Sequence, residues 1–554
     1  MIVLLFLLVL GPLLLHALST GTALLSNYNT ARKIGLPIFI LPISPENALW
    51  LIVGRHVAPW LKHLPFGGES ISKVGYSGWE WVQKFSIHLE YGDAFVLVTP
   101  GKNWLYTCNG ETLHDIFQRE RRGDFERPVE IWAMLASFGP NVTTALGEDW
   151  QRHRKITAAA FTEKTNRLVW TETISQAEQM LQYWKRVGHV RSTPNDCRNL
   201  ALNVLVSVSF GRSFPFRGGE EEEAKGPLSY QGSLRLILEN ILFVFIIGPD
   251  RLTRTTFPAN LARVGEAIVT FKKFMTEEFE EEKKALQEKR TTQENLMTNL
   301  VRAYVQDKET GGKRYGISEP EVFGNMFAFN FAGHDTTARS LNFSFYLLAA
   351  YAELQHWVYE EISHVYRGDP SPGYDSFPKL TRCMAFMYET LRLFTILVSV
   401  PRRTQDYATD LVIDGKTYTI PPQTRVLFNT NAAHTHPRHW GDDSLEFKPS
   451  RWILTAEGDG PAMDRESLRP PPRGAYMAWL DGNHVCPGKK FSQVEYAALL
   501  VTLLRDHYVE PVKEAGEDIE QARKRAKDCL ADSGVNLVFQ MLRPETVPLV
   551  WKRR

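Results

Sequence analysis

One short segment near the carboxyl-terminal end, "WLDGNHVCPGKKF" (residues 479–491), surrounds a cysteine with residues that bend a chain. Gly482 and Gly488 flank Cys486 and allow the backbone to turn, and Pro487 stiffens the turn. If Cys486 bound a metal, coordination would deprotonate the thiol, and the resulting thiolate would need backbone donors aimed at it. The segment therefore has the composition of a metal-ligand loop.

Residue types alone leave three interpretations of Cys486 open. A single axial thiolate is one arrangement that holds a haem iron. A zinc ion needs three or four ligands. The candidates nearby are His434, His436, His439 and His484, with no second cysteine close in sequence. A buried cysteine with a structural role fits the composition equally well.

A long apolar segment, residues 318–350, carries further groups capable of chemistry. Ser318 and Glu321 have the spacing of a capping box, and Pro320 suits a first helical turn. The sequence therefore predicts that a helix begins here and runs for about 30 residues.

The middle of this predicted helix reads "AGHDTT" (residues 332–337), which is a poor composition for a helix interior. One interpretation is a kink whose polar groups are satisfied locally. The other is an opening in the helix, where Gly333 lets a large group lie against the backbone. Asp335 and Thr336 would then offer an acid and a hydroxyl that pass protons into an apolar cavity.

A third polar group is the segment "ETLR", where Glu389 and Arg392 share a helix face. An exposed pair of this kind contributes little stability. The surrounding sequence "CMAFMYETLRLF" is apolar, however, and a buried pair needs further partners. Arg451, in "FKPSRW", is the candidate third member.

The elements that must position these groups are mostly helical. Helical patterns cover residues 148–190 and 227–304, whereas residues 85–107 indicate a hairpin that turns at Pro100-Gly101. The chain has 554 residues, is 44% apolar and has a net charge of +1, which gives no electrostatic reason to expect nucleic acid as a partner. Its five cysteines include no CxxC pair and favour free thiols over a disulfide framework.

The amino-terminal residues 1–25 are apolar and contain no Asp, Glu, Lys or Arg. They are long enough to span a bilayer as a helix. A cleaved signal peptide is the alternative, but no basic residue precedes the apolar run. Arg32 and Lys33 follow it, which predicts an uncleaved anchor with the body of the chain in the cytosol. Residues 26–54 are predicted as a proline-interrupted apolar connector.

In order and spacing, five motifs resemble those of the cytochrome P-450 haem-thiolate monooxygenases. The family motifs W-x-x-x-R, [AG]-G-x-[DE]-T-[TS], E-x-x-R, P-E-R-F and F-x-x-G-x-R-x-C-x-G are similar, in this order, to "WQRHR", "AGHDTT", "ETLR", "PSRW" and "WLDGNHVCPG". The resemblance covers residues 55–554. Three positions depart from it: Trp479 stands for Phe, His484 for Arg, and Ser450 for Glu.

The resemblance implies a mainly α fold with minor β, the cytochrome P-450 fold, preceded by the transmembrane helix. It implies haem (heme, iron protoporphyrin IX) as cofactor, with Cys486 as the axial ligand. It gives Asp335 and Thr336 a catalytic role in proton delivery, and makes Glu389, Arg392 and Arg451 structural. The residues implied around the haem are Trp150, Arg154, Gly333, Arg402, Trp479, Gly482, His484 and Gly488.

The resemblance further implies that O₂ and electrons from an NADPH-cytochrome P-450 reductase are used on the endoplasmic reticulum membrane. The implied pocket segments, residues 128–146, 327–331 and 395–400, are apolar and suit a terpenoid, a polyketide or a fatty chain of fungal secondary metabolism. Two alternatives stay open. One is a haem-thiolate isomerase or dehydratase that needs no reductase, and the other is a haem-binding sensor or carrier.

Overall fold

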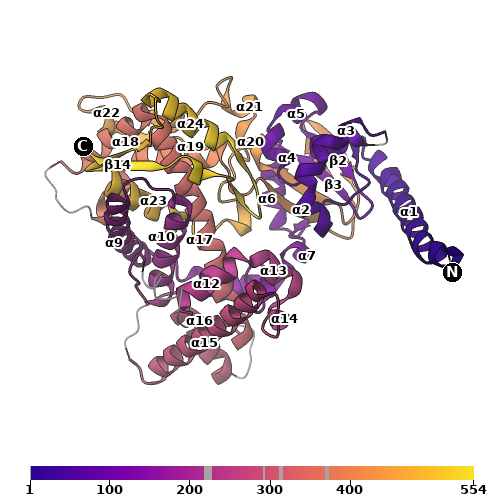
Figure 1. The fold of residues 1–554 in the computed structure, drawn as a ribbon, viewed down its shortest axis with the longest axis horizontal. Helices are drawn as coiled ribbons and strands as arrows, with labels where there is room; N and C mark the ends of the chain where they lie inside the picture. Colours follow the sequence, from indigo (N-terminus) through magenta and orange to yellow (C-terminus); the bar gives the residue numbers. More distant parts are fainter. Residues whose placement is uncertain (1, 66, 218–227, 291–293, 311–315, 368–372) are drawn as a thin grey trace.

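The computed structural model describes residues 2–65, 67–217, 228–290, 294–310, 316–367 and 373–554. In these residues the fold is mainly helical with a minor sheet, as the sequence predicts. Figure 1 shows the sheet and its short helices on one side of the molecule, the long helices on the other, and helix α1 projecting from the sheet side.

The main sheet has six strands in the order β1-β2-β3-β8-β5-β4. Both faces of the sheet are covered at strand β2, since all five of its residues are buried. Val96 and Val98 pack on one face with Phe117, whereas Phe95 and Leu97 pack on the other with residues of the first helices. The six strands are Ile38–Ile40 (β1), Ala94–Val98 (β2), Asn103–Thr107 (β3), Phe125–Glu126 (β4), Ser399–Thr404 (β5) and Arg425–Asn429 (β8).

Four two-stranded antiparallel sheets complete the β structure. They are Thr409–Ile413 with Lys416–Ile420 (β6, β7), Ile453–Thr455 with Glu466–Leu468 (β9, β10), His507–Pro511 with Leu549–Arg553 (β11, β14), and Ser533–Val535 with Phe539–Met541 (β12, β13). The predicted hairpin within residues 85–107 is present as β2 and β3, which pair antiparallel.

The helices that pack around the main sheet are short apart from the first. They are Ile2–Arg32 (α1), Ala48–Val57 (α2), Gly68–Val74 (α3), Trp79–Gln83 (α4), Ser86–Tyr91 (α5), Gly110–Glu120 (α6) and the 3-10 helix Ala58–His63 (η1).

The central part of the chain supplies most of the long helices. They are Val129–Trp132 (α7), Ala133–Ala136 (η2), Gly147–Ala158 (α8), Glu163–Val187 (α9), Thr193–Phe210 (α10), Tyr230–Glu239 (α12), Ile241–Ile247 (α13), Pro249–Leu252 (α14), Ala259–Gln287 (α15) and Leu296–Thr310 (α16).

The carboxyl-terminal part begins with the longest helix, Glu319–Ala350 (α17). The others are Ala352–Val365 (α18), Tyr374–Lys379 (η3), Thr381–Leu393 (α19), Thr430–Thr435 (α20), Pro437–Trp440 (α21), Pro449–Trp452 (η4), Ala462–Arg465 (α22), Gly482–His484 (η5), Lys489–Leu504 (α23), Ile519–Ala531 (α24) and Pro544–Thr546 (η6).

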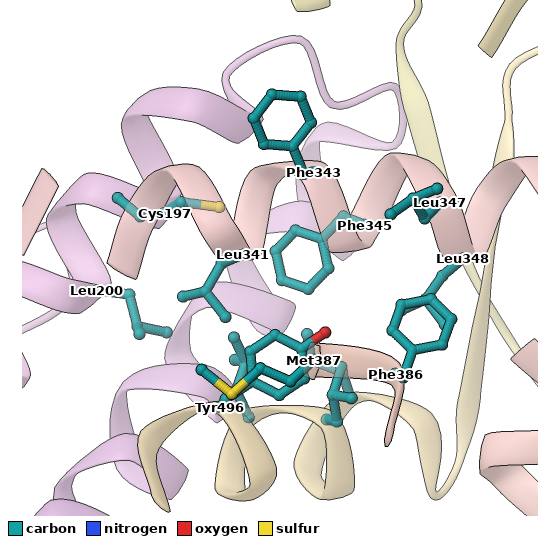
Figure 2. Close-up of a cluster of buried hydrophobic side chains, with 14 of the residues drawn as sticks. Cys197, Leu200, Leu341, Phe343, Phe345, Leu347, Leu348, Phe386, Met387 and Tyr496 are labelled. Carbon is teal, nitrogen blue, oxygen red and sulfur yellow. The ribbon is translucent and has the colours of Figure 1, made fainter. Parts of the chain in front are cut away.

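Helix α17 forms the centre of the largest core cluster. It begins where the sequence predicts, because Ser318 and Glu321 form the capping box. Figure 2 shows Leu341 and Phe345 pointing toward Tyr496 of α23. Phe343 points to the opposite side of the helix (Figure 2). Since α17 buries side chains around most of its circumference, it is held from several sides at once.

The predicted connector, residues 26–54, differs from the structure. Strand β1 pairs parallel with β2, so this segment belongs to the main sheet. Asn27 anchors the end of α1, because its side-chain amide donates to the carbonyl of Thr99 at 2.8 Å. Pro37 precedes β1 and Pro42 follows it, so these prolines bound a strand instead of preventing one.

The predicted transmembrane helix at residues 1–25 is not supported. Residues 2–25 lie in helix α1, but no single helix in the described part of the chain has the length and hydropathy required to cross a bilayer. Helices α12 and α13 pass that test only as a pair, and they are bent by 72° relative to each other.

Candidate active site

Cys486 lies in the turn between the short helix η5 and the long helix α23. Two left-handed residues shape this turn, Leu480 with φ of 60° and Gly482 with φ of 68°. The Cys486 amide then donates to the Trp479 carbonyl at 2.8 Å. Gly488, which the sequence analysis gave the same conformational role, has an ordinary φ of −83°. A Cβ there would lie 3.8 Å from the sulfur of Cys486, which is an ordinary van der Waals contact, so neither its φ nor crowding requires glycine at this position.

Cys486 differs from the other four cysteines in its exposure. Its side chain is accessible, whereas Cys108, Cys197, Cys383 and Cys529 are buried. Loss of hydration raises the pKa of the Cys486 thiol, against the opposing effect of the backbone N–H of Gly488 and the positive charges nearby. An accessible sulfur with a donor and cations aimed at it suits a thiolate that binds a metal.

Trp479 forms the side wall of this turn. Its indole N–H donates to the hydroxyl of Ser492 at 3.1 Å, and its ring lies 5.4 Å from that of Tyr388. The ammonium group of Lys489 lies 5.5 Å from the centre of the same ring. The tryptophan that replaces the usual phenylalanine is therefore fixed beside the cysteine by a hydrogen bond that phenylalanine cannot make.

Three arginines gather near His484, in the region that the resemblance assigns to the haem carboxylates. Arg154 donates to the Val485 carbonyl at 3.0 Å, and Arg402 is fully buried on strand β5. The third is Arg127, which the sequence analysis missed. Burial, and then the charge of Arg402, lower the pKa of Arg127 to about 10.

A buried carboxylate, Glu120, is the second residue of this region that the sequence analysis missed. Its Oε1 lies 2.9 Å from Nε of Arg402 and 3.3 Å from Nε2 of His484. Burial raises the pKa of Glu120, and Arg402 and Arg127 act in the opposite direction. The sequence offers no local signal for this contact, because Glu120 and Arg402 are 282 positions apart.

The predicted haem residue Trp150 packs against this cluster. Its ring centre lies 4.3 Å from that of His484, and burial with the neighbouring arginines lowers the pKa of His484 to about 2. His484 is therefore neutral near pH 7 and can still donate one hydrogen bond. It does not replace the charge of the arginine usual at this position.

The donor set fits an anionic cofactor. Within the described residues, Glu120 is the carboxylate paired with Arg402, while Arg127 and Arg154 donate to backbone carbonyls. Nε of Arg127 is buried without a hydrogen-bond partner. Buried cations and donors left over in this way are what the two carboxylates of a haem require. Arg127, Arg154 and Cys486 would hold such a group.

The predicted polar break in α17 is absent, because the helix is continuous from Glu319 to Ala350. The hydroxyls of Thr336 and Thr337 donate to the carbonyls of Ala332 and Gly333, at 2.8 and 3.0 Å. Bonds of this kind to the preceding turn satisfy the hydroxyls and let the helix continue. Of the two interpretations of residues 332–337, the one in which local hydrogen bonds satisfy the polar side chains therefore agrees better with the backbone, although the helix has no kink that ends it.

Gly333 packs closely against helix α10. A Cβ at this position would lie 3.0 Å from the end of the Leu205 side chain, so the glycine makes room for helix α10. Ala332, its neighbour, is the exposed residue on this turn.

Asp335 is held by two arginines. Arg198 and Arg339 place their Nε atoms 3.1 and 3.2 Å from its Oδ1. Burial opposes ionisation, but Arg339, His334 and Arg198 together lower the pKa of Asp335. A pocket of about 140 Å³ opens beside this ion-paired carboxylate, and Phe331 and Leu537 also line it.

Only some residues of the segments predicted to form the substrate pocket line the pockets observed here. Residues 396–399 line a second pocket of about 210 Å³, which shares Leu537 with the first. Phe327 is fully buried and stacks on Phe138 with ring centres 4.2 Å apart, so these two residues belong to the core.

The ion pair of "ETLR" is fully buried. Arg392 donates to both carboxylate oxygens of Glu389, at 2.8 and 2.9 Å. Arg451 and the indole of Trp452 each add a bond to Glu389 at 2.9 Å. The remaining guanidinium donors of Arg392 bond to carbonyls, including that of His434. Glu389, Arg392 and Arg451 thus meet as expected and tie α19 to the segment before Cys486.

The histidines considered as zinc ligands do not gather around Cys486 in a group with metal-ligand spacing among the described residues. Nε2 of His434 accepts from the amide of Met477 at 2.7 Å. Among the residues that the structure describes, the grouping with metal-ligand spacing is Asp93, Cys108 and His436. Arg438 already pairs with Asp93, so a cation occupies this position.

Comparison with known proteins gives consistent matches. The family model described as Cytochrome P450 matches residues 70–527. A cytochrome P450 monooxygenase of Arthrobotrys oligospora is 28% identical over 95% of this chain and 94% of its own length. Cytochrome P450 monooxygenase 124 of Postia placenta is 30% identical over 78% and 80%. A cytochrome P450 monooxygenase of the phomenoic acid biosynthesis cluster of Leptosphaeria maculans is 28% identical over 89% and 90%.

Proposed function

Because the chain belongs to the cytochrome P450 family and is a haem-thiolate monooxygenase of fungal type, we propose that it oxidises an apolar secondary metabolite, a terpenoid or a polyketide. Electrons would come from NADPH through a cytochrome P450 reductase. The observation that carries the proposal is the accessible Cys486, with the Gly488 N–H aimed at its sulfur. When bound, the haem supplies the centre at which O₂, two electrons and two protons give one inserted oxygen atom and one water.

The chain's own residues bind the haem and fix its position. Cys486 provides the thiolate, and the Gly488 N–H stabilises its charge. Arg127 and Arg154 bind the haem carboxylates and so fix the orientation of the ring. Glu389, Arg392 and Arg451 hold the preceding segment rigid, which keeps the cysteine turn in place.

Protons would enter by way of Asp335. Its carboxylate is ionised and borders a pocket on the side where Arg198 and Arg235 also line it, so it can accept a proton from water there. Thr336 would pass the proton onward, for which its hydroxyl must give up the bond to the Ala332 carbonyl. The neighbouring Thr337 makes the same kind of bond but is buried.

The relatives support the substrate class. One of them is named for the phomenoic acid biosynthesis cluster of its fungus, and the segments around the two pockets contribute apolar side chains such as Phe331, Ile396 and Leu537. An apolar molecule would bury more surface in such walls than a charged one.

Attachment to the endoplasmic reticulum membrane is part of the proposal, with the catalytic body in the cytosol. Leu49 and Trp60 near the sheet, and Phe243 and Ile246 of α13, are large apolar side chains exposed to solvent. Exposed apolar groups of this kind favour contact with a membrane or a partner. Carbonate extraction of microsomes, followed by protease protection, tests both the attachment and the orientation.

The deciding experiment is the carbon monoxide difference spectrum of reduced protein, followed by turnover with a reductase and NADPH. We expect the strongly red-shifted Soret band of a thiolate opposite carbon monoxide. Cys486→Ala should abolish this band, whereas Cys529→Ala, the matched control, should keep it. Product formed from an apolar substrate without NADPH or a reductase would instead favour the isomerase or dehydratase. A stable haem complex that never consumes NADPH would favour a sensor or carrier.

A further inference from the structure

Glu120 is a buried acid in a region that otherwise collects positive charge. It is the last residue of α6, and its side chain is only 3% exposed. Its carboxylate faces Arg402 of β5 and His484 of η5, two residues expected to bind haem carboxylates. A carboxylate of the protein thus occupies the donors that a carboxylate of the cofactor would need.

The contacts of Arg402 show that Glu120 is the carboxylate that faces it. Nε lies 2.9 Å from one oxygen of Glu120 and NH2 lies 3.5 Å from the other, while NH1 donates to the Pro401 carbonyl at 3.0 Å. Each nitrogen of the guanidinium therefore has an oxygen close by without any cofactor. Nε of Arg402 meets Glu120 as an ion pair without hydrogen-bond geometry, whereas Nε of Arg127 is buried with neither a hydrogen bond nor, among the described residues, a carboxylate beside it.

A buried carboxylate is costly to maintain, so a pair of this kind is expected to serve more than packing. Apolar rings lie on two sides of the Arg402 guanidinium, since those of Phe117 and Phe428 have their centres 6.0 and 5.4 Å away. Water screens charges less in such surroundings than at the surface, so the charge of Glu120 acts more strongly on nearby groups than an exposed carboxylate would.

We propose that Glu120 is a positioning residue that occupies Arg402 in place of a haem carboxylate, directs those carboxylates to Arg127 and Arg154, and holds the reduction potential of the iron low. The inference rests on the proposed haem site. The sign follows from Coulomb's law, because a negative charge near the haem favours the ferric state, which carries one more positive charge than the ferrous state.

The test compares purified, haem-loaded wild-type protein with Glu120→Gln, which keeps the shape and removes the charge. We expect a higher reduction potential in a spectroelectrochemical titration. We also expect slower haem transfer to apomyoglobin, by about tenfold, since Arg402 is freed to make one charge-assisted bond. An unchanged or lower potential, or transfer at the wild-type rate or faster, overturns the proposal.

Two further variants make the test specific. Glu126→Gln is the matched control, because Glu126 pairs with Arg403, the next residue along the same strand, and its potential should stay at the wild-type value. Glu120→Asp keeps the charge and should also stay near wild type. Failure of Glu120→Gln to retain haem also overturns the proposal, because a freed Arg402 should hold the haem more tightly. The carbon monoxide spectrum of each variant shows separately whether Cys486 still ligates the iron, so a failure here leaves the proposed function intact.

Discussion

The guanidinium of Arg392 donates to both oxygens of Glu389, at 2.8 and 2.9 Å, and both side chains are completely buried. Removing one partner of such a pair leaves an uncompensated charge in the interior. We therefore expect Arg392→Met to lower the free energy of unfolding by about 3–5 kcal/mol, measured by denaturant titration. Asp375→Asn breaks an exposed ion pair with Arg167 and should change the free energy of unfolding far less. Equal effects would contradict the structural role of Glu389 and Arg392.

Thr336 and Thr337 provide a matched pair for testing proton delivery. Both hydroxyls bond to the carbonyl four residues earlier, but Thr337 is buried. Thr336→Ala should leave NADPH consumption within about twofold of wild type while most of the reduced oxygen appears as hydrogen peroxide instead of product. Thr337→Ala should remain coupled. The measurement is the ratio of product and peroxide to NADPH, and normal coupling in Thr336→Ala would remove Thr336 from the relay.

Asp335 should respond to the loss of Arg198. The pKa of Asp335 is lowered, with Arg339, His334 and Arg198 outweighing its burial. Removing the positive charge of Arg198 moves the pKa of Asp335 upward, so Arg198→Gln should shift the acid limb of the coupling-versus-pH profile to higher pH. Arg235→Gln, on the wall of the same pocket, is the control. A profile that does not move would show that Asp335 does not limit proton entry.

The stability that Glu321 contributes at the start of α17 should depend on pH. Its carboxylate bonds to Arg152 at 2.6 Å and to His153 at 3.0 Å, and these partners with Ser318 lower its pKa despite the opposing effect of burial. A lowered folded-state pKa stabilises the protein above the ordinary glutamate value of about 4.5, and this contribution fades as the pH falls below it. Glu321→Gln should cost about 1–3 kcal/mol at pH 7 and progressively less toward pH 3. A constant cost across this range, in chemical denaturation, would exclude the charge as its source.

Two glycines of α17 should tolerate alanine very differently. A Cβ on Gly324 would lie 2.3 Å from the backbone carbonyl of Pro140, whereas a Cβ on Gly333 would meet only the end of Leu205 at 3.0 Å. A side-chain end can move and a packed backbone cannot. Gly324→Ala should therefore reduce the free energy of unfolding by about 2 kcal/mol or more, and Gly333→Ala by less than about 1 kcal/mol. The reverse order, measured by thermal unfolding, would contradict this packing.

Much of the local structure follows from the sequence, because short-range signals specify it. The capping box at Ser318 sets the first residue of α17, and the alternation around Pro100-Gly101 sets the hairpin. The spacing of "ETLR" places Glu389 and Arg392 on one helix face. The family also follows from sequence, since the order of five motifs does not depend on knowing their positions in space.

The tertiary structure alone decided which distant groups meet. It brought Glu120 to Arg402 and left Nε of Arg127 without a partner. It also drew strand β1 into the main sheet, where the sequence indicated a connector. The threonine hydroxyls bond to their own helix, so α17 is continuous through a segment whose composition predicts a break. Some of these outcomes depend on contacts between elements that lie far apart in the chain, and others on the balance between packing and local preference. The spacing of residues along one segment determines neither.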